Sequence, residues 1–186
     1  GIPYPESLIV NTDEAVKPLL KKSGFQRCWI KRGDFHAMHK EDVSFVRHID
    51  EAQEVLQEYF LRGIKRAVIN VHLDGDLIKF YGIKGTPFFY WFYPLEAGHS
   101  KYGYEEINGH SQGIKFDEKE LRNICDRASE ELNVEVYGGD CIVSAEGDMK
   151  IIDFNDWPSF APCRTEAAPH IAKRVLALVK EWEQKK

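Results

Sequence analysis

The stretch from Tyr137 to Phe160 constrains the fold more than any other part of the chain. Two apolar runs, Cys141–Ala145 and Met149–Phe154, flank the turn signal Glu146-Gly147-Asp148. Alternating apolar runs joined by a short glycine-containing turn are typical of an antiparallel β-hairpin. The sequence therefore predicts two paired strands here, and the turn decides which side chains face one another.

Three polar side chains of this hairpin are predicted to share one face. If Glu146 and Gly147 form a two-residue loop, Asp140 lies opposite Asp153, and Asn155 joins them because strand side chains alternate. Opposed like charges destabilise a sheet, so a cation is expected between them. Two carboxylates and an amide oxygen suit Mg²⁺, with Mn²⁺ as the alternative. A turn longer by one residue would break this pairing.

The composition bounds the class of protein. The chain has 186 residues, of which 43% are hydrophobic and 12% aromatic, enough for one domain with a core or for two small lobes. A net charge of -5 and the absence of a basic tract argue against a nucleic-acid partner. No apolar run approaches the ~18 residues of a membrane span, and no signal peptide is present. Four cysteines without paired spacing indicate buried thiols and a cytoplasmic location.

The periodicity predicts an α+β chain with mainly antiparallel sheets. Strands are expected at residues 8–10, 25–31, 43–47, 65–73, 77–83 and 87–93, before the hairpin. Three helices are expected to begin after the N-cap residues Thr12, Asp50 and Asp117, and the first two to stop at Gly24 and Gly63. The third runs through Leu132, and a fourth runs from Arg164 to the C-terminus. The last helix is predicted to bury the stripe Ile171, Val175, Leu178, Val179 and Trp182.

Asp74-Gly75 marks a second predicted hairpin, between the strands at 65–73 and 77–83. A natural division of the chain falls at the same place, so we expect a smaller lobe at residues 1–73 and a larger lobe at 74–186. The long connection at residues 94–115 carries His99, Lys101, Tyr102, Tyr104 and His110. Long connections are often functional, so these side chains either face a second substrate or form a solvated loop.

Two lysines point to a nucleotide. The chain has neither GxxxxGK[ST] nor GxGxxG, the two commonest phosphate-binding loops. It does place Lys31 and Lys79 within predicted strands, where lysine is unfavoured unless its ammonium group reaches solvent or an anion. A triphosphate bound with magnesium needs both lysines and carboxylates.

On these residues the chain resembles the ATP-binding lobes of the ATP-grasp superfamily. The resemblance implies two lobes of mainly antiparallel sheet with ATP between them. Lys31, at the end of CWIKRG, would reach the phosphates, and the loop Gly33–His39 would close over them. His36 and His39 would supply donors there, as a histidine does in one branch of the superfamily, unless they are simply exposed loop residues.

The resemblance also implies where the rest of the nucleotide lies. The strand Ile69-Asn70-Val71-His72 would give backbone groups to the adenine, which makes Asn70, Val71 and His72 cofactor-binding residues. The ribose would be taken by Asp74 or Asp76, with Asp76 preferred. Lys79 would be the second phosphate-binding lysine.

The metal ligands implied by the resemblance are Asp140, Asp153 and Asn155, followed by the turn at Pro158. This D…D-x-N-x-x-P arrangement is most similar to the branch containing inositol polyphosphate kinases and glutamate-adding ligases. Arg164 would bind an acidic substrate or a phosphate, with a surface ion pair as the alternative. The chain departs from the superfamily at Trp157 and Ser159, and an upstream substrate lobe is expected to be missing.

The resemblance implies an ATP- and Mg²⁺-dependent carboxylate–amine ligase that acts through an acyl phosphate. Its substrate would be a small molecule or a peptide with a carboxylate. Two alternatives stay open. One is a kinase of the same fold that phosphorylates a hydroxyl, as in the inositol polyphosphate kinase branch. The other is a nucleotide-binding module without turnover.

Overall fold

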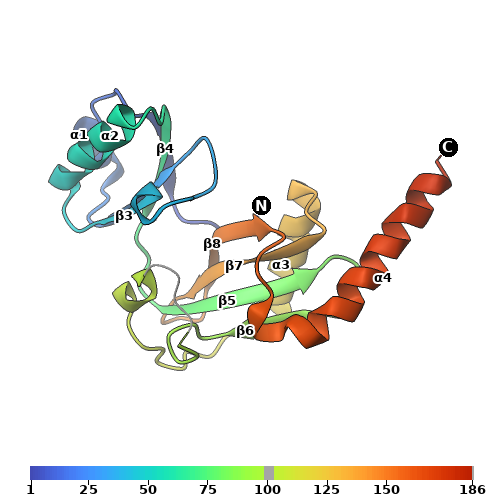
Figure 1. The fold of residues 1–186 in the computed structure, drawn as a ribbon. Coiled ribbons are helices and arrows are strands. Elements are labelled where there is room, and N and C mark those ends of the chain that lie inside the picture. Colours follow the sequence, from blue (N-terminus) through green and yellow to red (C-terminus); the bar gives the residue numbers. More distant parts are fainter. Residues whose placement is uncertain (99–102, 186) are drawn as a thin grey trace. The chain divides into compact units, whose positions relative to one another are not determined.

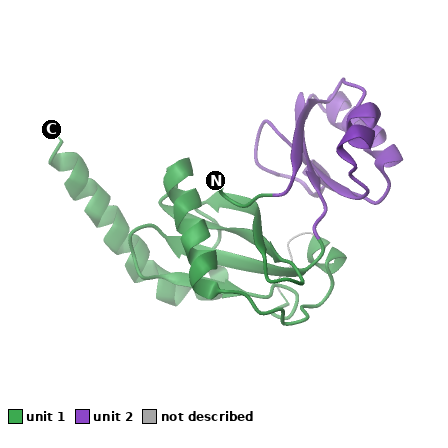
Figure 2. Ribbon diagram, turned by 180° about the vertical axis from the view of Figure 1, so that it is seen from behind, with its two compact units in different colours: residues 1–4, 74–186 green, residues 5–73 purple. Residues whose placement is uncertain are grey.

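The chain forms two compact units, each built on its own four-stranded antiparallel sheet (Figure 2). The computed structural model describes residues 1–98 and 103–185, so the predicted loop residues His99, Lys101 and Tyr102 lie outside the described part. The small unit comprises residues 5–73, and the large unit comprises residues 1–4 with 74–186. The predicted α+β class with mainly antiparallel sheets is confirmed. No helix within the described ranges combines the length and the apolar character needed to cross a membrane.

The small unit packs two helices against one face of its sheet (Figure 1). The strand order is β1-β4-β2-β3. The elements are β1 (Ser7–Asn11), α1 (Lys17–Ser23), β2 (Cys28–Arg32), β3 (Val43–Val46), α2 (Ala52–Leu61) and β4 (Arg66–Val71), with short 3₁₀ turns η1 (Lys40–Asp42) and η2 (Ile49–Glu51). Alternate strand residues such as Ile30 and Ile69 face Leu20 and Leu56 of the helices, and all four are fully buried. The other face of the sheet, which carries Lys31, is left outside this core.

Two predicted helix caps of the small unit are wrong. Thr12 does not cap α1, because its hydroxyl donates instead to the carbonyl of Ile64, 2.7 Å away, and α1 begins only at Lys17. Asp50 does not cap α2 either, since its carboxylate pairs with Lys17 and the N-cap residue is Glu51. The predicted stop at Gly24 is confirmed, with a left-handed φ of 77°.

The large unit has the strand order β6-β5-β7-β8, and α3 covers one face of this sheet (Figure 1). Its elements are β5 (Asp76–Ile83), β6 (Phe89–Phe92), η3 (Tyr104–Ile107), α3 (Glu118–Leu132), β7 (Val136–Val143), β8 (Met149–Asp156), η4 (Ala161–Cys163) and α4 (Arg164–Glu183). The predicted cap of α3 is confirmed, because the Asp117 carboxylate accepts from the backbone N–H groups of Lys119 and Glu120. Cys125 and Cys141 lie in this core as buried thiols.

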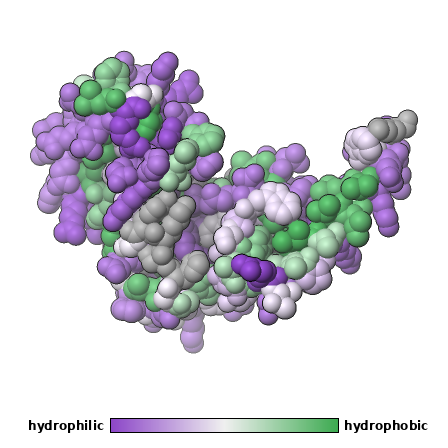
Figure 3. Space-filling model, in the orientation of Figure 1, coloured by the Kyte–Doolittle hydropathy of each residue, from purple (hydrophilic) through white to green (hydrophobic). Residues whose placement is uncertain are grey.

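The predicted buried stripe of the last helix is wrong over its second half. Val175, Val179 and Trp182 are 40%, 47% and 57% exposed, because α4 extends beyond the sheet and only its first turns pack against it. Ala167 and Ile171 make that packing contact. The outer half of α4 therefore shows an apolar strip along the helix at the right of Figure 3.

The predicted hairpin at Asp74-Gly75 is also wrong. β4 belongs to the sheet of the small unit and β5 to that of the large unit, so this dipeptide joins the two units. Glycine is required there for a packing reason. A Cβ atom on Gly75 would lie 2.1 Å from the carbonyl oxygen of Val143, and its φ is 144°.

The β7–β8 hairpin has the predicted pairing of Asp140 with Asp153. The loop and the register that produce this pairing differ from the predicted ones. The loop contains three residues, not two: Ser144 donates to the carbonyl of Asp148, and Gly147 closes the loop in the left-handed region at φ 86°. This shifts the register by one residue. A bulge at Ile152 shifts it back, because Cys141 is opposite Ile151 whereas Asp140 is opposite Asp153.

Gly139 is predicted to be essential for this hairpin. A Cβ atom there would lie 2.0 Å from the carbonyl oxygen of Asp153, a backbone atom that cannot move without breaking the pairing. We expect Gly139→Ala to reduce the free energy of unfolding by about 3 kcal/mol in urea titrations. Gly33→Ala, where the nearest atoms are 3.3 Å away, is the graded comparison and should lose much less. Equal losses in the two variants would contradict the register described above.

Candidate functional site

The open face of the large sheet carries two rows of side chains that cross all four strands. The first row is Phe92, Lys79, Asp140 and Asp153, from β6, β5, β7 and β8 in that order. The second row, one step along the strands, is Tyr90, Tyr81, Gly138 and Asn155. Four predicted site residues (Lys79, Asp140, Asp153 and Asn155) are thus brought together by strand pairing.

Lys79 balances the acidic row. Its ammonium nitrogen lies 2.8 Å from Asp140 Oδ1 and 3.7 Å from Glu105 Oε1. Burial disfavours the charged form of the lysine, but the attraction of Asp140 and Glu105 outweighs it, and the pKa of Lys79 is raised. Lys79 therefore stays charged at neutral pH.

Asp153 lies opposite Asp140 on the neighbouring strand. The one lysine of the row, Lys79, pairs with Asp140. Its Oδ2 atom accepts a hydrogen bond of 2.7 Å from the Asn155 side-chain amide, which fixes both side chains on one face. Within residues 1–98 and 103–185, no three His, Cys, Asp or Glu side chains are arranged to hold a metal ion. The donor set is therefore two carboxylates and one amide, fewer ligands than a metal bound by protein groups alone would need.

Glycine and proline shape the end of the second row. A Cβ atom on Gly138 would lie 2.8 Å from Pro158 Cγ and 2.9 Å from the carbonyl oxygen of Phe80. The missing side chain lets the chain after β8 fold back over the sheet. As a result, Phe160 packs on Tyr81 with ring centroids 5.1 Å apart. Phe92, on the neighbouring strand β6, also stacks on Tyr81, at 6.3 Å. Aromatic rings thus flank the acidic row.

Asp76 has a structural role that speaks against its predicted contact with ribose. It is three residues from Lys79 on β5, so its side chain faces the opposite side of the sheet. The carboxylate is 2% exposed and accepts from the backbone N–H groups of Gln112 and Ile114 at 2.7 and 2.8 Å. Asp76 therefore anchors the end of the long connection, and Asp74 is left as the predicted ribose ligand.

In the small unit, Lys31 lies on the sheet face away from the helices. It is paired with Val43 and Val68, and Trp29 precedes it on the same face. Trp29 packs on Phe45 with ring centroids 4.9 Å apart and donates through Nε1 to His72 Nδ1 at 3.1 Å. His72 therefore accepts at Nδ1, as the neutral form of the ring does. This atom is already used, so it is not the one that would contact the nucleotide.

The strand predicted to contact adenine, at residues 69–72, uses several of its groups for hydrogen bonds within the small unit. The N–H of Val71 donates to the carbonyl of Glu6, and the N–H of His72 donates to that of Arg27, both at 2.9 Å. The Asn70 side chain donates to Ser7 Oγ at 2.6 Å. β4 is a central strand, flanked by β1 and β2, which is why its amides are taken up. The N–H groups of Val71 and His72 are thus already used within the small unit, and the predicted contact of this strand with adenine stays a prediction for its other backbone groups.

The loop Gly33–His39 is held at its end by Asp42, which sequence reasoning missed. The fully buried Asp42 carboxylate accepts from the N–H groups of Met38 and His39 at 2.9 and 3.1 Å, and pairs with Arg62. Burial opposes ionisation, yet these donors and the Arg62 charge together lower the pKa of Asp42 well below its usual range. The other end is fixed where the Gly33 N–H donates to the Arg66 carbonyl.

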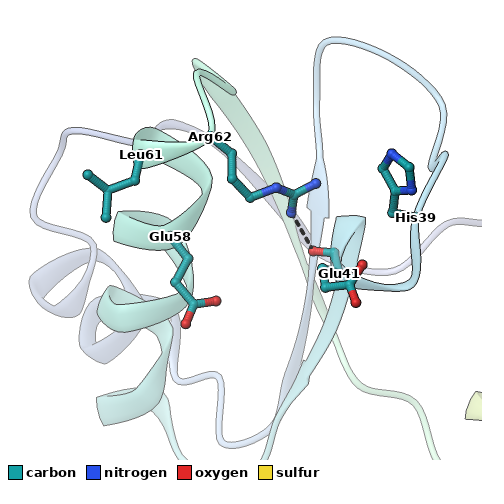
Figure 4. A pocket seen from close by; sticks show the side chains of 5 residues that line it. All are labelled: His39, Glu41, Glu58, Leu61 and Arg62. Carbon is teal, nitrogen blue, oxygen red and sulfur yellow. Dashed lines mark hydrogen bonds between the residues drawn. The ribbon is translucent and has the colours of Figure 1, made fainter.

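His36 and His39 are exposed on this loop. The His36 ring lies on Phe35, with centroids 4.2 Å apart. His39 lines a pocket with Glu41, Glu58, Leu61 and Arg62, between the loop and α2 (Figure 4). Arg62 donates to the Glu41 carbonyl in this pocket. The two histidines thus belong to different surroundings although they are three residues apart.

Arg164 was predicted as a site residue, and Glu105 is a neighbour of the site that was not predicted. Arg164 is exposed at the first position of α4, where the helix dipole disfavours a cation, so helix stability does not explain it. Glu105, in η3, is 8% exposed and lies beside Lys79, a contact that sequence reasoning missed. Its position within a long connection gave no periodic signal.

Asp42 supplies a pH-dependent contribution to stability. Because its folded pKa is lowered, this contribution is present above the unfolded pKa of about 3.9 and is lost as the pH falls toward the folded value. Asp42→Asn should cost on the order of 3 kcal/mol at pH 7 in urea titrations. The difference from wild type should be roughly 1 kcal/mol smaller at pH 3. Asp34→Asn, which removes a surface pair, should be nearly neutral, and a pH-independent loss in Asp42→Asn would contradict the assignment.

No protein-family model and no curated protein matches this chain. Solved structures do match. The D-alanine–D-alanine ligase from Bacillus anthracis, complexed with ATP, has a TM-score of 0.69 at 18% identity over 97% of this chain and 63% of its own. The D-alanine–D-alanine ligase from Coxiella burnetii has a TM-score of 0.62 at 15% identity over 88% and 45%.

A third solved structure is the ATP-grasp ligase PsnB with precursor peptide PsnA2 and AMPPNP, which has a TM-score of 0.57 at 17% identity over 95% of this chain and 54% of its own. The chain thus spans about half the length of the structures it matches. At these identities the likeness is one of fold. The chain has the ATP-grasp fold.

Proposed function

We propose that this chain binds ATP with Mg²⁺ and forms the nucleotide-binding part of a carboxylate–amine ligase. The observation that carries the proposal is the row Lys79, Asp140 and Asp153, with Asn155 beside it, on the open face of a sheet. A charged lysine next to two facing carboxylates and an amide offers groups for phosphate and for a hard cation within one surface.

The donor set fits Mg²⁺. This ion commonly keeps waters and substrate phosphates in its coordination shell, so two carboxylates and one amide oxygen are sufficient protein ligands. Asp140, Asp153 and Asn155 would hold it. When bound, it supplies charge neutralisation at the phosphoryl oxygens. The positive charge also relieves the repulsion between Asp140 and Asp153, for which Lys79 compensates on the Asp140 side.

The chain's own residues then have distinct tasks. Lys79, held charged by Asp140 and Glu105, binds phosphate oxygens. Lys31 of the small unit also binds phosphate oxygens. His36 donates a hydrogen bond to them from the loop that Asp42 anchors. Arg164 binds the acidic substrate or a phosphate. Such fixed charges act by positioning the reactants and by stabilising the developing charge, which is most of what phosphoryl transfer requires.

The surroundings of the row favour a ligase over an inositol-phosphate-type kinase. The eight residues of the two rows contain Lys79 as their single basic residue, and their neighbours are aromatic. A polyphosphate acceptor would need a cluster of arginine and lysine side chains. The three solved structures reported above are ligases, two of them with ATP or AMPPNP. The acceptor is therefore proposed to be a carboxylate, activated as an acyl phosphate and attacked by an amine.

Calorimetry tests the nucleotide site. Wild-type protein should bind ATP in the presence of Mg²⁺, and Asp153→Asn should weaken that binding at least tenfold because one ligand charge is removed. Asp148→Asn, an exposed carboxylate at the turn of the same hairpin, is the matched control and should bind like wild type. Absence of Mg-ATP binding by the wild-type protein would refute the proposal.

Hydroxylamine trapping tests the reaction class. An acyl phosphate reacts with hydroxylamine to give a hydroxamate and inorganic phosphate, whereas the phosphate ester made by a kinase is stable. We expect hydroxamate to form with Mg-ATP and at least one member of a panel of amino acids and peptides. Lys79→Met should lower its rate about 100-fold or more, because a phosphate-binding charge is lost. A phosphorylated polyol with no hydroxamate would favour the kinase.

A further inference from the structure

Trp157 has a backbone conformation that its side chain disfavours. It is one of two non-glycine residues with positive φ in the described parts of the chain, at 43°, and the other is Asn133 at 53°. Asn133 caps the end of α3, where asparagine in this conformation is common. A bulky aromatic residue there is unusual, because its Cβ crowds the backbone. The indole is also 62% exposed, so burial does not compensate.

The neighbouring residues impose this conformation. The N–H of Trp157 donates to the carbonyl of Val136 at 2.9 Å, which holds the chain at the end of β8. Pro158 then packs into the space left by the missing side chain of Gly138. The turn therefore needs a left-handed residue at position 157, but it does not need an indole. Glycine would meet the same requirement without strain.

A residue that costs stability and is not buried is best explained by a ligand. The position of Trp157 indicates which one. It follows Asn155 by two residues, at the end of the strand that carries the acidic row. The segment Ile151–Cys163 contains Asp153 and Asp156 and no lysine or arginine. An aromatic ring in an acidic segment attracts an organic cation, and indole is the best ring for this contact.

We propose that Trp157 binds the protonated amine-bearing substrate and determines the specificity for it, at the expense of fold stability. This inference rests on the proposed ligase function for the identity of the substrate. The binding of an ammonium group to Trp157 itself is a property of the large unit alone. It can therefore be measured without nucleotide.

The first experiment measures stability with a matched pair of variants. Trp157→Gly and Asn133→Gly each replace a left-handed residue by glycine. Both should raise the melting temperature, by about 2 °C or more for Trp157→Gly, because the larger side chain has the greater strain to lose. A lower melting temperature for Trp157→Gly would show that the indole packs against the protein and would overturn the proposal.

The second experiment measures binding by the indole N–H resonances of ¹⁵N-labelled wild-type protein. The Trp157 signal is identified by its loss in Trp157→Gly. Titration with n-pentylammonium chloride should shift it saturably, and 1-pentanol and sodium pentanoate should give shifts at least tenfold smaller at equal concentration. Trp182 is the internal control, since it is 57% exposed and lies between Glu181 and Glu183 on α4.

The outcomes separate this inference from the proposed function. A selective shift of Trp157 over Trp182 supports the inference, whether or not the wild-type protein binds Mg-ATP in calorimetry. Equal shifts of the two signals, or equal shifts by pentanol, would mean only general contact with exposed indoles and would overturn it. Selective binding of pentanoate would assign the surface to the carboxylate substrate instead and would equally overturn it.

Discussion

The pairing of β7 with β8 is the constraint on which the candidate site depends. The three-residue loop displaces the two strands by one position, and the bulge at Ile152 restores the register just before Asp140 meets Asp153. Since a slip of one residue turns every side chain to the opposite face, one of these features without the other would put Asp153 into the α3 core. The absence of a side chain at Gly139 allows the strands to approach closely enough. A bulge beside a functional row is a common way of aiming side chains in sheets.

Charge balance on this face follows from the pairing. The row brings two half-buried carboxylates together, and the buried Glu105 adds a third acid from the long connection. Lys79 compensates for part of this charge and is held ionised by it. Lys79 therefore leaves part of the negative charge on this face uncompensated. Such an excess is expected of a surface that binds a cation.

Two buried aspartates play the same structural role in the two units. Asp42 and Asp76 each accept two backbone N–H groups from a connecting loop, and each fixes one end of a segment that carries predicted site residues. These loops are therefore anchored by charge-assisted hydrogen bonds. Trp157 shows the opposite arrangement, in which its neighbours fix the backbone in a conformation that a bulky side chain disfavours.

The sequence by itself determined the fold class, most of the strands, the cap of α3 and the pairing of Asp140 with Asp153. These features depend on local periodicity and on short turn signals, which are readable along the chain. The pairing was nevertheless predicted from a two-residue loop, whereas the loop has three residues. The unforeseen bulge at Ile152 shifts the register by the same amount in the opposite direction, so the two errors cancelled. Local pattern cannot reveal this bulge, because Ile152 is as apolar as Ile151 before it.

Only the tertiary structure decided the remaining features. Asp74-Gly75 has the signal of a hairpin, but whether the next strand returns to the same sheet depends on partners distant in sequence. The exposure of Val175 and Val179 depends on where the sheet ends, not on the helix that carries them. Asp42 and Glu105 acquire their roles from Arg62 and Lys79, which lie 20 and 26 positions away along the chain. Burial and charge pairing between distant residues leave no periodic trace in a single sequence.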